Sequence, residues 1–420
     1  MRHRVLVFPC GSDNALELYE SLRYSPHFEV FGATSVVDKS SLIYPPDRLL
    51  SLPYIYEDDF VAAINKVAAE NEIEMIFSTH DSVLLELVKR RGDIRALALG
   101  CDLFTAELCR YKDKLYKFFE GEDFIPRWTQ DPEKMRDETR IVKPIDGQGA
   151  VGCERVEAGE TISVRAGTMI SQFLSGPEYT IDCFTDRKGK LAFCGGRTRD
   201  IIKMGITFRS RPHHSAKIER IGEILNERLG FRGLWFFQVK EDNEGNPKLL
   251  EISSRVATTM GLCRQRGVNL PLMTAYDALD MDISVIKQAF PIELETFLER
   301  RYRTDLEYKT LYVDYDDTLT VHDRVNANLI KFLYQAADRG KELILLTRHE
   351  GDIYQELERR KICAGLFARI IHLAPDADKL PYISGNAIYI DNMFHDRKVV
   401  AEKIGARVFD VDAIECLMDY

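Results

Sequence analysis

The sequence predicts a multidomain protein that combines α/β and α+β architecture. In the first hundred residues and again after residue 310, short apolar runs alternate with stretches of helical spacing, which indicates two doubly wound parallel sheets. The part between them is rich in strand-like segments separated by turns, which indicates an α+β region built on antiparallel sheet. A chain of 420 residues is also too long for one ordinary domain.

Composition describes a soluble globular chain and excludes several functional classes. The apolar fraction is 45%, yet no run approaches the roughly 18 consecutive apolar residues that span a bilayer. The net charge of −10 argues against a nucleic-acid partner, because no basic surplus exists to neutralise phosphates. The 9 cysteines are scattered and form no C-x-x-C pair, which disfavours disulfides and structural zinc. The VLVF run near the N-terminus is too short for a signal peptide, so we expect a cytoplasmic protein without a membrane partner.

Residues 1–104 are expected to form the first parallel sheet. Strands are predicted at Arg4–Phe8, Glu29–Ala33, Met75–Ser78 and Ala96–Leu99. Helices are predicted at Asn14–Arg23, Asp59–Glu70 and Ser82–Arg90. Asp81, at a strand end in STHDS, is a candidate for lining a substrate cleft.

Residues 105–298 are expected to form the α+β domain. It begins with two helical segments that flank RYKDKLYKFF. Strands are predicted at Arg140–Lys143, Gly152–Val156, Met169–Phe173, Tyr179–Thr185, Lys190–Gly195, Leu234–Lys240 and Lys248–Ile252. Helices are predicted near Ser215–Leu229 and Leu270–Leu279.

Residues 299–309 are charged and poor in aliphatic side chains, so they are expected to be a linker. Residues 310–420 then return to the alternating pattern of a second parallel sheet. Strands are predicted at Leu311–Asp314, Glu342–Leu346, Arg369–His372, Ala387–Ile390 and Arg407–Phe409. Helices are predicted at Val325–Arg339, Asp352–Lys361 and His395–Lys403.

A glycine-rich segment, RIVKPIDGQGAVGCERV, is the first candidate site. Its glycines Gly147, Gly149 and Gly152 match G-x-G-x-x-G, but CERVEAG follows as a strand and turn, whereas a dinucleotide fingerprint needs a helix there. A glycine-rich loop between two strands can instead lay backbone N–H groups over phosphates. Lys143, on the strand that enters the loop, can reach a phosphate from below. A plain hairpin with a surface lysine is the alternative.

Three further features support a nucleotide site. Lys114 in RYKDK is a second candidate cation. In MISQFLSGPEYTIDCF, backbone groups of Gln172, Phe173 and Leu174 could bond an adenine edge, and Glu178 could take ribose hydroxyls.

The third feature is a pair of strands joined by the turn DNEGNP. Gln238 and Glu251 can lie side by side on these antiparallel strands and supply oxygen ligands to Mg²⁺. Ser253 and Arg255 are expected on the same side as Glu251, because strand side chains alternate.

Together these motifs resemble the ATP-grasp superfamily of ATP-dependent carboxylate ligases over about residues 1–290, including a Rossmann-like leading domain. The matching motifs are DK at 113–114, VKPIDGQGAVG at 142–152, SQFLSGPEYTID at 171–182 and LLEISSR ending at Arg255. The pairing of glutamine with glutamate looks most like the halves of carbamoyl phosphate synthase large subunits.

The resemblance implies ATP and Mg²⁺ as cofactors, with Mn²⁺ as an alternative metal. It implies that Lys114, Lys143 and the loop glycines hold the phosphates, that Gln172–Leu174 and Glu178 hold the nucleoside, and that Gln238, Glu251 and Ser253 bind the metal. Arg255 would steady the transferring phosphoryl group, and Arg197 and Arg199 would contact the substrate carboxylate or acyl phosphate. The chain has EISSR where the superfamily usually has E-I-N-P-R, so the shorter Ser253 replaces asparagine as the third metal ligand.

The segment LYVDYDDTLT is the first element of a second candidate site. It places Asp314 at the end of an apolar strand, with Asp316 two residues later. One carboxylate can attack phosphorus, and the other can protonate the leaving group and then activate water. The alternative is that Asp316 and Asp317 only cap a helical turn.

Three later elements favour the catalytic interpretation. Thr347 ends the next strand, Lys379 follows in DADKLPY, and Asp391 ends another strand. Thr347 and Lys379 can hold phosphoryl oxygens, and Asp391 can complete a Mg²⁺ site with Asp314.

These four elements resemble the haloacid dehalogenase (HAD) superfamily of phosphatases over residues 310–420. The resemblance implies Asp314 as nucleophile, Asp316 as acid/base, and Asp314, Asp316 and Asp391 at the metal. The intervals between the elements are about 30 residues each, which leaves no room for a cap domain.

The sequence therefore predicts a bifunctional enzyme. Its ligase part would join a small-molecule carboxylate to an amine, and its phosphatase part would hydrolyse a phosphate ester. The alternative is an ATP-binding sensor or scaffold in which only the phosphatase is active. The oligomeric state stays open, with a homodimer among the options.

Overall fold

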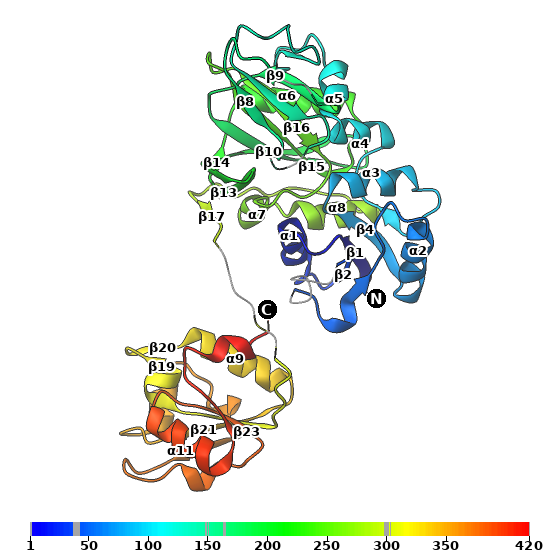
Figure 1. Ribbon diagram of the computed structural model, residues 1–420. Coiled ribbons are helices and arrows are strands. Elements are labelled where there is room, and N and C mark those ends of the chain that lie inside the picture. Colours follow the sequence, from blue (N-terminus) through cyan, green and yellow to red (C-terminus); the bar gives the residue numbers. More distant parts are fainter. Residues whose placement is uncertain are drawn as a thin grey trace. The chain divides into compact units, whose positions relative to one another are not determined.

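The computed structural model describes residues 2–36, 43–147, 149, 151–162, 165–297, 302 and 304–419. The chain divides into two compact units, Met1–Leu298 and Glu299–Tyr420, called unit 1 and unit 2 below (Figure 1). The linker predicted at residues 299–309 lies partly outside the described ranges. Within those ranges, no helix is long and apolar enough to cross a membrane.

Unit 1 begins with a parallel sheet in the order β3-β2-β1-β4-β5. Its strands are β1 (His3–Phe8), β2 (Phe28–Thr34), β3 (Leu49–Ser51), β4 (Ile73–Ser78) and β5 (Leu97–Ala98), and its helices are α1 (Asp13–Leu22), α2 (Phe60–Glu70) and α3 (Asp81–Lys89). Each predicted strand and helix of this region is confirmed, while the short β3 was not predicted. The strand order changes direction between β1 and β4, and open α/β sheets bind ligands beyond the strand ends at such a point.

Two helices lead from this sheet into the antiparallel part, α4 (Leu103–Arg110) and α5 (Lys112–Phe118). Two helices were expected to flank the segment RYKDKLYKFF. This is wrong for the second helix, because α5 runs through the segment instead of following it. Leu115 of α5 and Phe119, the residue directly after the helix, are both buried, and this four-residue spacing is typical of a helix packed on a core.

The antiparallel part of unit 1 contains two larger sheets. One has the order β6-β9-β7-β8 and the other β14-β11-β10-β15-β16. Their strands are β6 (Trp128–Thr129), β7 (Arg140–Pro144), β8 (Glu154–Val156), β9 (Thr168–Gln172), β10 (Glu178–Thr185), β11 (Leu191–Thr198), β14 (Pro212–His213), β15 (Gly233–Glu241) and β16 (Pro247–Ser253), and the helices are α6 (Ala216–Arg228), α7 (Gly261–Gln265) and α8 (Leu270–Ala278). All seven strands predicted for this region are confirmed among them.

A third, small sheet was not predicted. It has the order β12-β13-β17, with strands β12 (Ile201–Lys203), β13 (Ile206–Ser210) and β17 (Leu294–Glu295). Its strands are only two to five residues long, too short to show the apolar alternation that marks longer strands.

One hydrophobic core joins the leading sheet of unit 1 to its antiparallel part. The same buried cluster contains Val5 and Val7 of β1 and Leu234 and Phe236 of β15. The leading sheet is therefore packed against the strands that carry the candidate ligase residues.

Unit 2 is built on a parallel sheet in the order β22-β21-β18-β23-β24. Its strands are β18 (Thr310–Val313), β21 (Glu342–Thr347), β22 (Arg369–His372), β23 (Ala387–Ile390) and β24 (Arg407–Phe409). Its helices are α9 (Ala327–Asp338), α10 (Ile353–Arg359) and α11 (Phe394–Ile404). A separate hairpin is formed by β19 (Thr320–Val321) and β20 (Arg324–Val325). The strands and helices predicted for residues 310–420 are confirmed.

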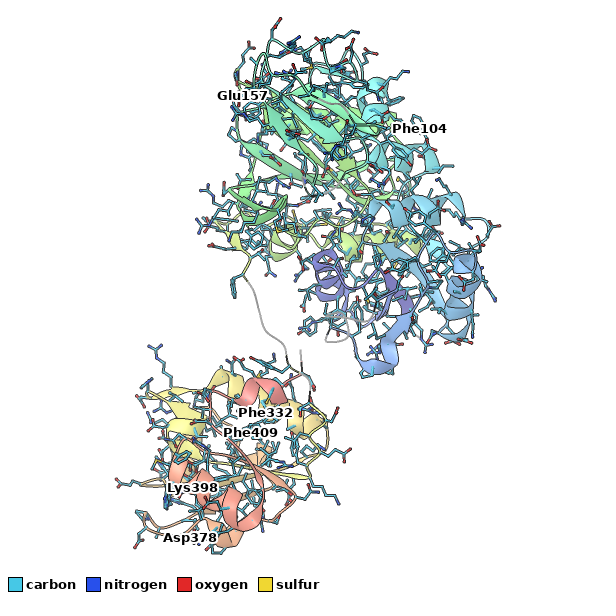
Figure 2. The ribbon with its side chains drawn as sticks, in the orientation of Figure 1. Phe104, Glu157, Phe332, Asp378, Lys398 and Phe409 are labelled. Atoms are coloured by element: carbon cyan, nitrogen blue, oxygen red, sulfur yellow. The ribbon has the colours of Figure 1, made fainter. Side chains whose placement is uncertain are left out.

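The core of unit 2 is filled by the apolar side chains of the central strands and of α9. Phe332 on α9 is fully buried there, whereas Lys398 and Asp378 lie at the surface (Figure 2). Because the strands are parallel, the residues that follow β18, β21 and β23 meet at the same edge of the sheet.

Candidate functional site

Unit 1 contains two cavities that share a wall. Cavity 1 encloses about 300 Å³ and cavity 2 about 370 Å³. The residues common to both are Gly149, Val151, Arg199, Gly205, Gln238 and Glu251. A ligand in one cavity therefore lies directly next to a ligand in the other.

Cavity 1 gathers most of the residues predicted to bind a nucleotide. Those in its lining are Lys143, Gly147, Gly149, Gln172, Phe173, Leu174 and Glu178. Gly152 is not in the lining, and a Cβ atom there would approach Pro144 Cγ to 2.9 Å. The role of Gly152 is thus to shape the glycine-rich loop.

The turn between β12 and β13 touches the glycine-rich loop over the cavities. A Cβ atom on Gly205 would come within 2.2 Å of the carbonyl carbon of Gly149, so only glycine fits at that position. Arg199 Nη2 donates to Gly205 O at 2.8 Å and holds the turn there. Sequence reasoning missed this hairpin and therefore its contact with the loop.

Lys143 is 7% exposed and lies in the wall of cavity 1. Its Nζ donates to the hydroxyl oxygen of Tyr116 at 2.9 Å. Burial lowers the pKa of the Lys143 ammonium to about 8. A phosphate group in the cavity would favour the charged form of this lysine.

Lys114 is not brought to cavity 1, in contrast to Lys112. Lys114 Nζ is half-exposed and lies 2.8 Å from Glu107 Oε2. Lys112 lines the cavity, donates to Gly147 O at 2.6 Å and lies 3.7 Å from Glu251 Oε2. Both lysines stand on α5, where residues two apart point to different sides. The spacing of Leu115 and Phe119 was the signal that could have identified the inner lysine.

The predicted metal pair is brought together. Gln238 and Glu251 are directly opposite each other on β15 and β16, and both line the two cavities. Among the described residues, no group of three or more His, Cys, Asp or Glu side chains could hold a metal ion. An amide oxygen and one carboxylate nevertheless fit Mg²⁺, which protein sites commonly hold with one or two carboxylates together with nucleotide phosphates.

Ser253 is not placed as a metal ligand in either cavity. Its side chain is buried, and its hydroxyl donates to Asp81 Oδ1 at the start of α3. Asp81 Oδ2 also accepts from Arg255 Nε at 3.1 Å. Asp81, which was expected to line a cleft, instead joins Ser253 to Arg255 and orients the guanidinium that lines cavity 2.

Two arginines of β11 and its following turn have different surroundings. Arg197 is 1% exposed and is held by two hydrogen bonds to Asp182, at 2.7 and 3.0 Å. Arg199 Nε lies 2.9 Å from Glu178 Oε1 in the wall shared by the cavities. Arg199 therefore lies between the two cavities, while Arg197 supports the wall of cavity 2.

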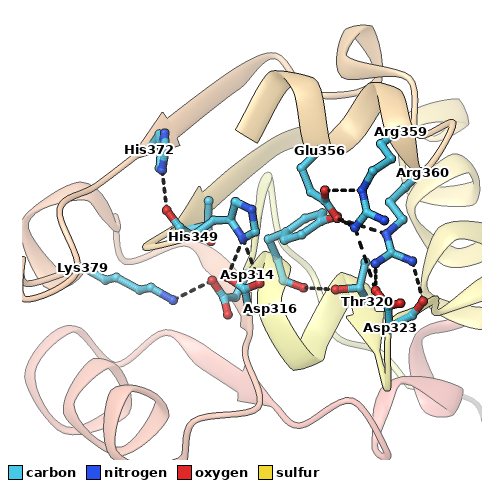
Figure 3. Close-up of polar contacts among 12 residues, drawn as sticks. Asp314, Asp316, Thr320, Asp323, His349, Glu356, Arg359, Arg360, His372 and Lys379 are labelled. Atoms are coloured by element: carbon cyan, nitrogen blue, oxygen red, sulfur yellow. Dashed lines mark hydrogen bonds and ion pairs between the residues drawn. The ribbon is translucent and has the colours of Figure 1, made fainter. Parts of the chain in front are cut away.

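The predicted residues of unit 2 meet at the edge of its sheet. Lys379 Nζ lies 2.8 Å from Asp314 Oδ1 and 2.8 Å from Asp391 Oδ2 (Figure 3 draws its contact with Asp314). Tyr389 also donates to Asp391. Asp314 and Asp391 therefore converge on one ammonium group at the edge of the sheet.

Thr347 and Asp316 flank this centre. Thr347 is fully buried at the end of β21, and its Oγ1 accepts from the backbone N–H of His349 at 3.2 Å. His349 Nδ1 lies 2.9 and 3.1 Å from the two oxygens of Asp316, as Figure 3 shows. Sequence reasoning missed His349, although its place two residues after Thr347 puts it in the same strand-end loop.

The pKa of Asp314 is raised to about 6 by burial and, less strongly, by Asp391, while Lys379 opposes the shift. Between the ordinary value of 3.8 and about 6, the folded protein keeps a proton that the unfolded chain has lost. The free energy of unfolding therefore falls as the pH rises through this range and stays lowered above it. The difference corresponds to about 3 kcal/mol.

In Mg²⁺-free buffer, Asp314→Asn is therefore expected to raise the free energy of unfolding of unit 2 by up to about 3 kcal/mol at pH 8. The gain in the free energy of unfolding should shrink at pH 4. Asp314 is then protonated in the folded protein, and asparagine removes only the cost of its ionised form. Denaturant-dependent hydrogen exchange of the amides of β18 and β23 measures this in the full-length protein. A gain that is equal at both pH values would contradict the assigned cause.

Solved structures share the architecture of unit 1. An L-amino acid ligase from Bacillus licheniformis is 18% identical with a TM-score of 0.53, and the match covers 66% of this chain and 74% of that one. An N5-carboxyaminoimidazole synthetase from Staphylococcus aureus, complexed with ADP, is 11% identical with a TM-score of 0.58 and covers 71% and 83%. A biotin carboxylase–ATP complex from Campylobacter jejuni is 14% identical with a TM-score of 0.55 and covers 67% and 72%. Unit 1 therefore has the mixed α/β fold called ATP-grasp.

A sequence profile gives a narrower likeness. The family described as "ATP-grasp in the biosynthetic pathway with Ter operon" matches residues 165–297, which run from β9 to β17. None of the curated proteins matches the sequence.

Proposed function

We propose that unit 1 is an ATP- and Mg²⁺-dependent ligase that activates a carboxylate as an acyl phosphate for attack by an amine. The observation that carries this proposal is the Gln238–Glu251 pair in the wall shared by the two cavities. A phosphoryl group passing from a nucleotide in cavity 1 to an acid in cavity 2 would cross at this pair.

The residues of cavity 1 would bind the nucleotide. Lys143 and Lys112 would hold the phosphates, and the N–H groups of the glycine-rich loop would cover them. Gln172, Phe173 and Leu174 would line the base, with Glu178 at the ribose.

In the wall shared by the two cavities, Gln238 and Glu251 would hold Mg²⁺. When bound, this ion would supply positive charge that neutralises the phosphates. Arg255, oriented by Asp81, would steady the transferring phosphoryl group, and Arg199 would orient the acid. Catalysis would rest on positioning and charge, so no protein nucleophile is needed.

Acid-dependent ADP release tests the ligase. We expect some carboxylates, presented with amines, to increase ADP formation by the full-length protein. ATP binding without any such increase would favour the sensor or scaffold alternative. The finer likeness to carbamoyl phosphate synthase halves stays a prediction.

We further propose that unit 2 is a HAD-like phosphatase. Asp314 would attack the phosphorus of a phosphate ester, and Asp316 would protonate the leaving oxygen and then activate water. Lys379 and Thr347 would hold phosphoryl oxygens, and Asp314, Asp316 and Asp391 would form the Mg²⁺ site. The meeting of Asp314 and Asp391 on Lys379 supports this proposal. Mg²⁺-dependent release of p-nitrophenol from p-nitrophenyl phosphate tests it.

ATP is expected to protect Cys153 from alkylation. Cys153 follows the glycine-rich loop and lines cavity 1, so a bound nucleotide would cover its thiol. We expect saturating Mg·ATP to slow its reaction with N-ethylmaleimide by about tenfold or more, as measured by peptide mass spectrometry.

Cys363 is the matched control, because it is an exposed free cysteine of unit 2. Its rate of alkylation should not change with Mg·ATP. Equal alkylation of Cys153 with and without the nucleotide would contradict the assignment of cavity 1.

A further inference from the structure

The imidazole of His349 contacts the carboxylate that the proposed phosphatase would use as acid and base. His349 Nδ1 lies 2.9 Å from Asp316 Oδ1 and 3.1 Å from Asp316 Oδ2, so one ring nitrogen faces both carboxylate oxygens (Figure 3). The side chain of Asp316 is 52% exposed, whereas that of His349 is 18% exposed. The phosphatase mechanism proposed above uses Asp316 but assigns no role to His349.

His349 is itself held by three parts of unit 2. Its backbone N–H donates to Thr347 Oγ1 at 3.2 Å, at the end of β21. Its carbonyl oxygen lies 2.7 Å from His372 Nε2, at the end of β22. Its ring meets the ring of Tyr315 edge to face, with the centroids 5.0 Å apart and the planes at 72°. These contacts restrict the imidazole to the side of the loop on which Asp316 lies.

Tyr315 is held in turn by the end of α10. It is buried, and its hydroxyl donates to Glu356 Oε1 at 3.0 Å. The same oxygen accepts from Arg359 Nη2 at 2.6 Å and from Arg360 Nε at 3.0 Å. Figure 3 draws the contacts of Glu356 with these arginines beside that of His349 with Asp316. Through His349, the half-exposed Asp316 is therefore connected to the packed part of unit 2.

A surface carboxylate without a partner can adopt several rotamers, and holding it in one of them costs conformational entropy. An acid/base group must nevertheless lie within hydrogen-bond reach of the oxygen that it protonates. Neutral imidazole has one donor nitrogen and one acceptor nitrogen, in either tautomer. Nδ1 of His349 can therefore donate to an ionised Asp316 or accept from a protonated one, so the contact can orient this carboxyl group in both halves of the reaction.

We propose that His349 is a positioning residue, which holds the Asp316 carboxyl group in the orientation needed to protonate the leaving oxygen. This inference rests on the proposed phosphatase function. In that step the bond from phosphorus to the leaving oxygen breaks, a bond from phosphorus to an Asp314 oxygen forms, and the proton of Asp316 passes to the leaving oxygen. His349 acts through Asp316 and does not touch the phosphorus.

Two phosphate esters with leaving oxygens of different basicity test this role. The strongly basic oxygen of phenyl phosphate depends on protonation far more than the weakly basic oxygen of p-nitrophenyl phosphate. We expect His349→Ala to lower kcat/KM by at least about 30-fold for phenyl phosphate, but by less than about fivefold for p-nitrophenyl phosphate. Phosphate release by the full-length protein measures both rates, with Mg²⁺ at saturation for each variant.

The ratio of the two rates is the decisive quantity. A partial loss of folded protein lowers both rates by the same factor and leaves the ratio unchanged, whereas a misplaced acid changes it. If His349→Ala does not fold, His349→Ser gives the same comparison.

A conservative variant and a control complete the test. In His349→Asn, the amide nitrogen is as many bonds from the backbone as Nδ1 of histidine, so it can donate to Asp316 in its place. This variant should recover most of the phenyl phosphate activity that alanine loses. Tyr334→Ala, at an exposed position of α9, should leave both rates unchanged.

The outcomes separate this inference from the phosphatase proposal. Equal losses for the two esters, or an undiminished rate with phenyl phosphate, would overturn the inference and retain the phosphatase. A His349→Asn protein that is as impaired as His349→Ala would overturn it as well. Release of phosphate from neither ester by the wild type would reject the phosphatase, and the inference with it.

Discussion

Replacing Asp314 by asparagine is expected to lower the rate of Mg²⁺-dependent p-nitrophenyl phosphate hydrolysis by more than about 10³-fold. Asparagine keeps the size of the side chain but removes the anion that attacks phosphorus. It also removes one of the two carboxylates that contact Lys379. Steady-state release of p-nitrophenol by the full-length protein measures the effect.

Asp317→Asn is the matched control for this substitution. Asp317 is exposed, and its backbone has φ of 49°, a conformation that asparagine tolerates as well as aspartate. Its hydrolysis rate should stay within a factor of about three of the wild type. Equal losses in the two variants would mean that the segment, and not the Asp314 carboxylate, matters. Undiminished activity of Asp314→Asn would reject the nucleophile assignment.

Replacing Glu251 by glutamine is expected to lower acid-dependent ADP release by at least about 100-fold. The substitution removes the carboxylate of the Gln238–Glu251 pair while leaving the strand pairing intact. The half-saturating concentration of Mg²⁺ should rise, because two neutral amides bind the cation more weakly than an amide and a carboxylate. ADP release titrated with Mg²⁺ measures both effects.

Binding of the nucleotide without metal should survive this substitution. Lys112 and Lys143 remain in cavity 1, and the negative charge near the phosphates is reduced. Glu244→Gln, in the exposed turn of the same hairpin, is the control and should behave like the wild type. A Glu251→Gln protein with normal Mg²⁺ dependence would remove Glu251 from the metal site.

Much of the fold could be predicted from the sequence because both parallel sheets have strong local signals. Each of their central strands is an apolar run, such as the stretch that forms β18, and helices such as α9 have one buried face. The hairpin β12–β13 could not be predicted in this way. It is held by its contact with the glycine-rich loop at Gly205 and Gly149, which are far apart in sequence.

For the candidate sites too, local signals in the sequence predicted some residues, while others depend on contacts between distant parts of the chain. The residues predicted at strand ends or on paired strands lie close together in the structure, since the alternation of strand side chains is visible in the sequence. Gln238 lies opposite Glu251, and Asp314 meets Asp391 through Lys379. The lysine on α5 was misjudged, because a motif match gives the position in the chain but not the side of the helix.

Local periodicity and the residues that end each strand establish the alternating elements, the two separate groups of chemically active residues and their order along the chain. The packed structure was needed to show that Lys112 lines cavity 1, that Ser253 bonds Asp81, and that Gly205 contacts the glycine-rich loop. Each of these contacts depends on partners distant in sequence, because their packing decides which side chains are enclosed and which ones line a cavity.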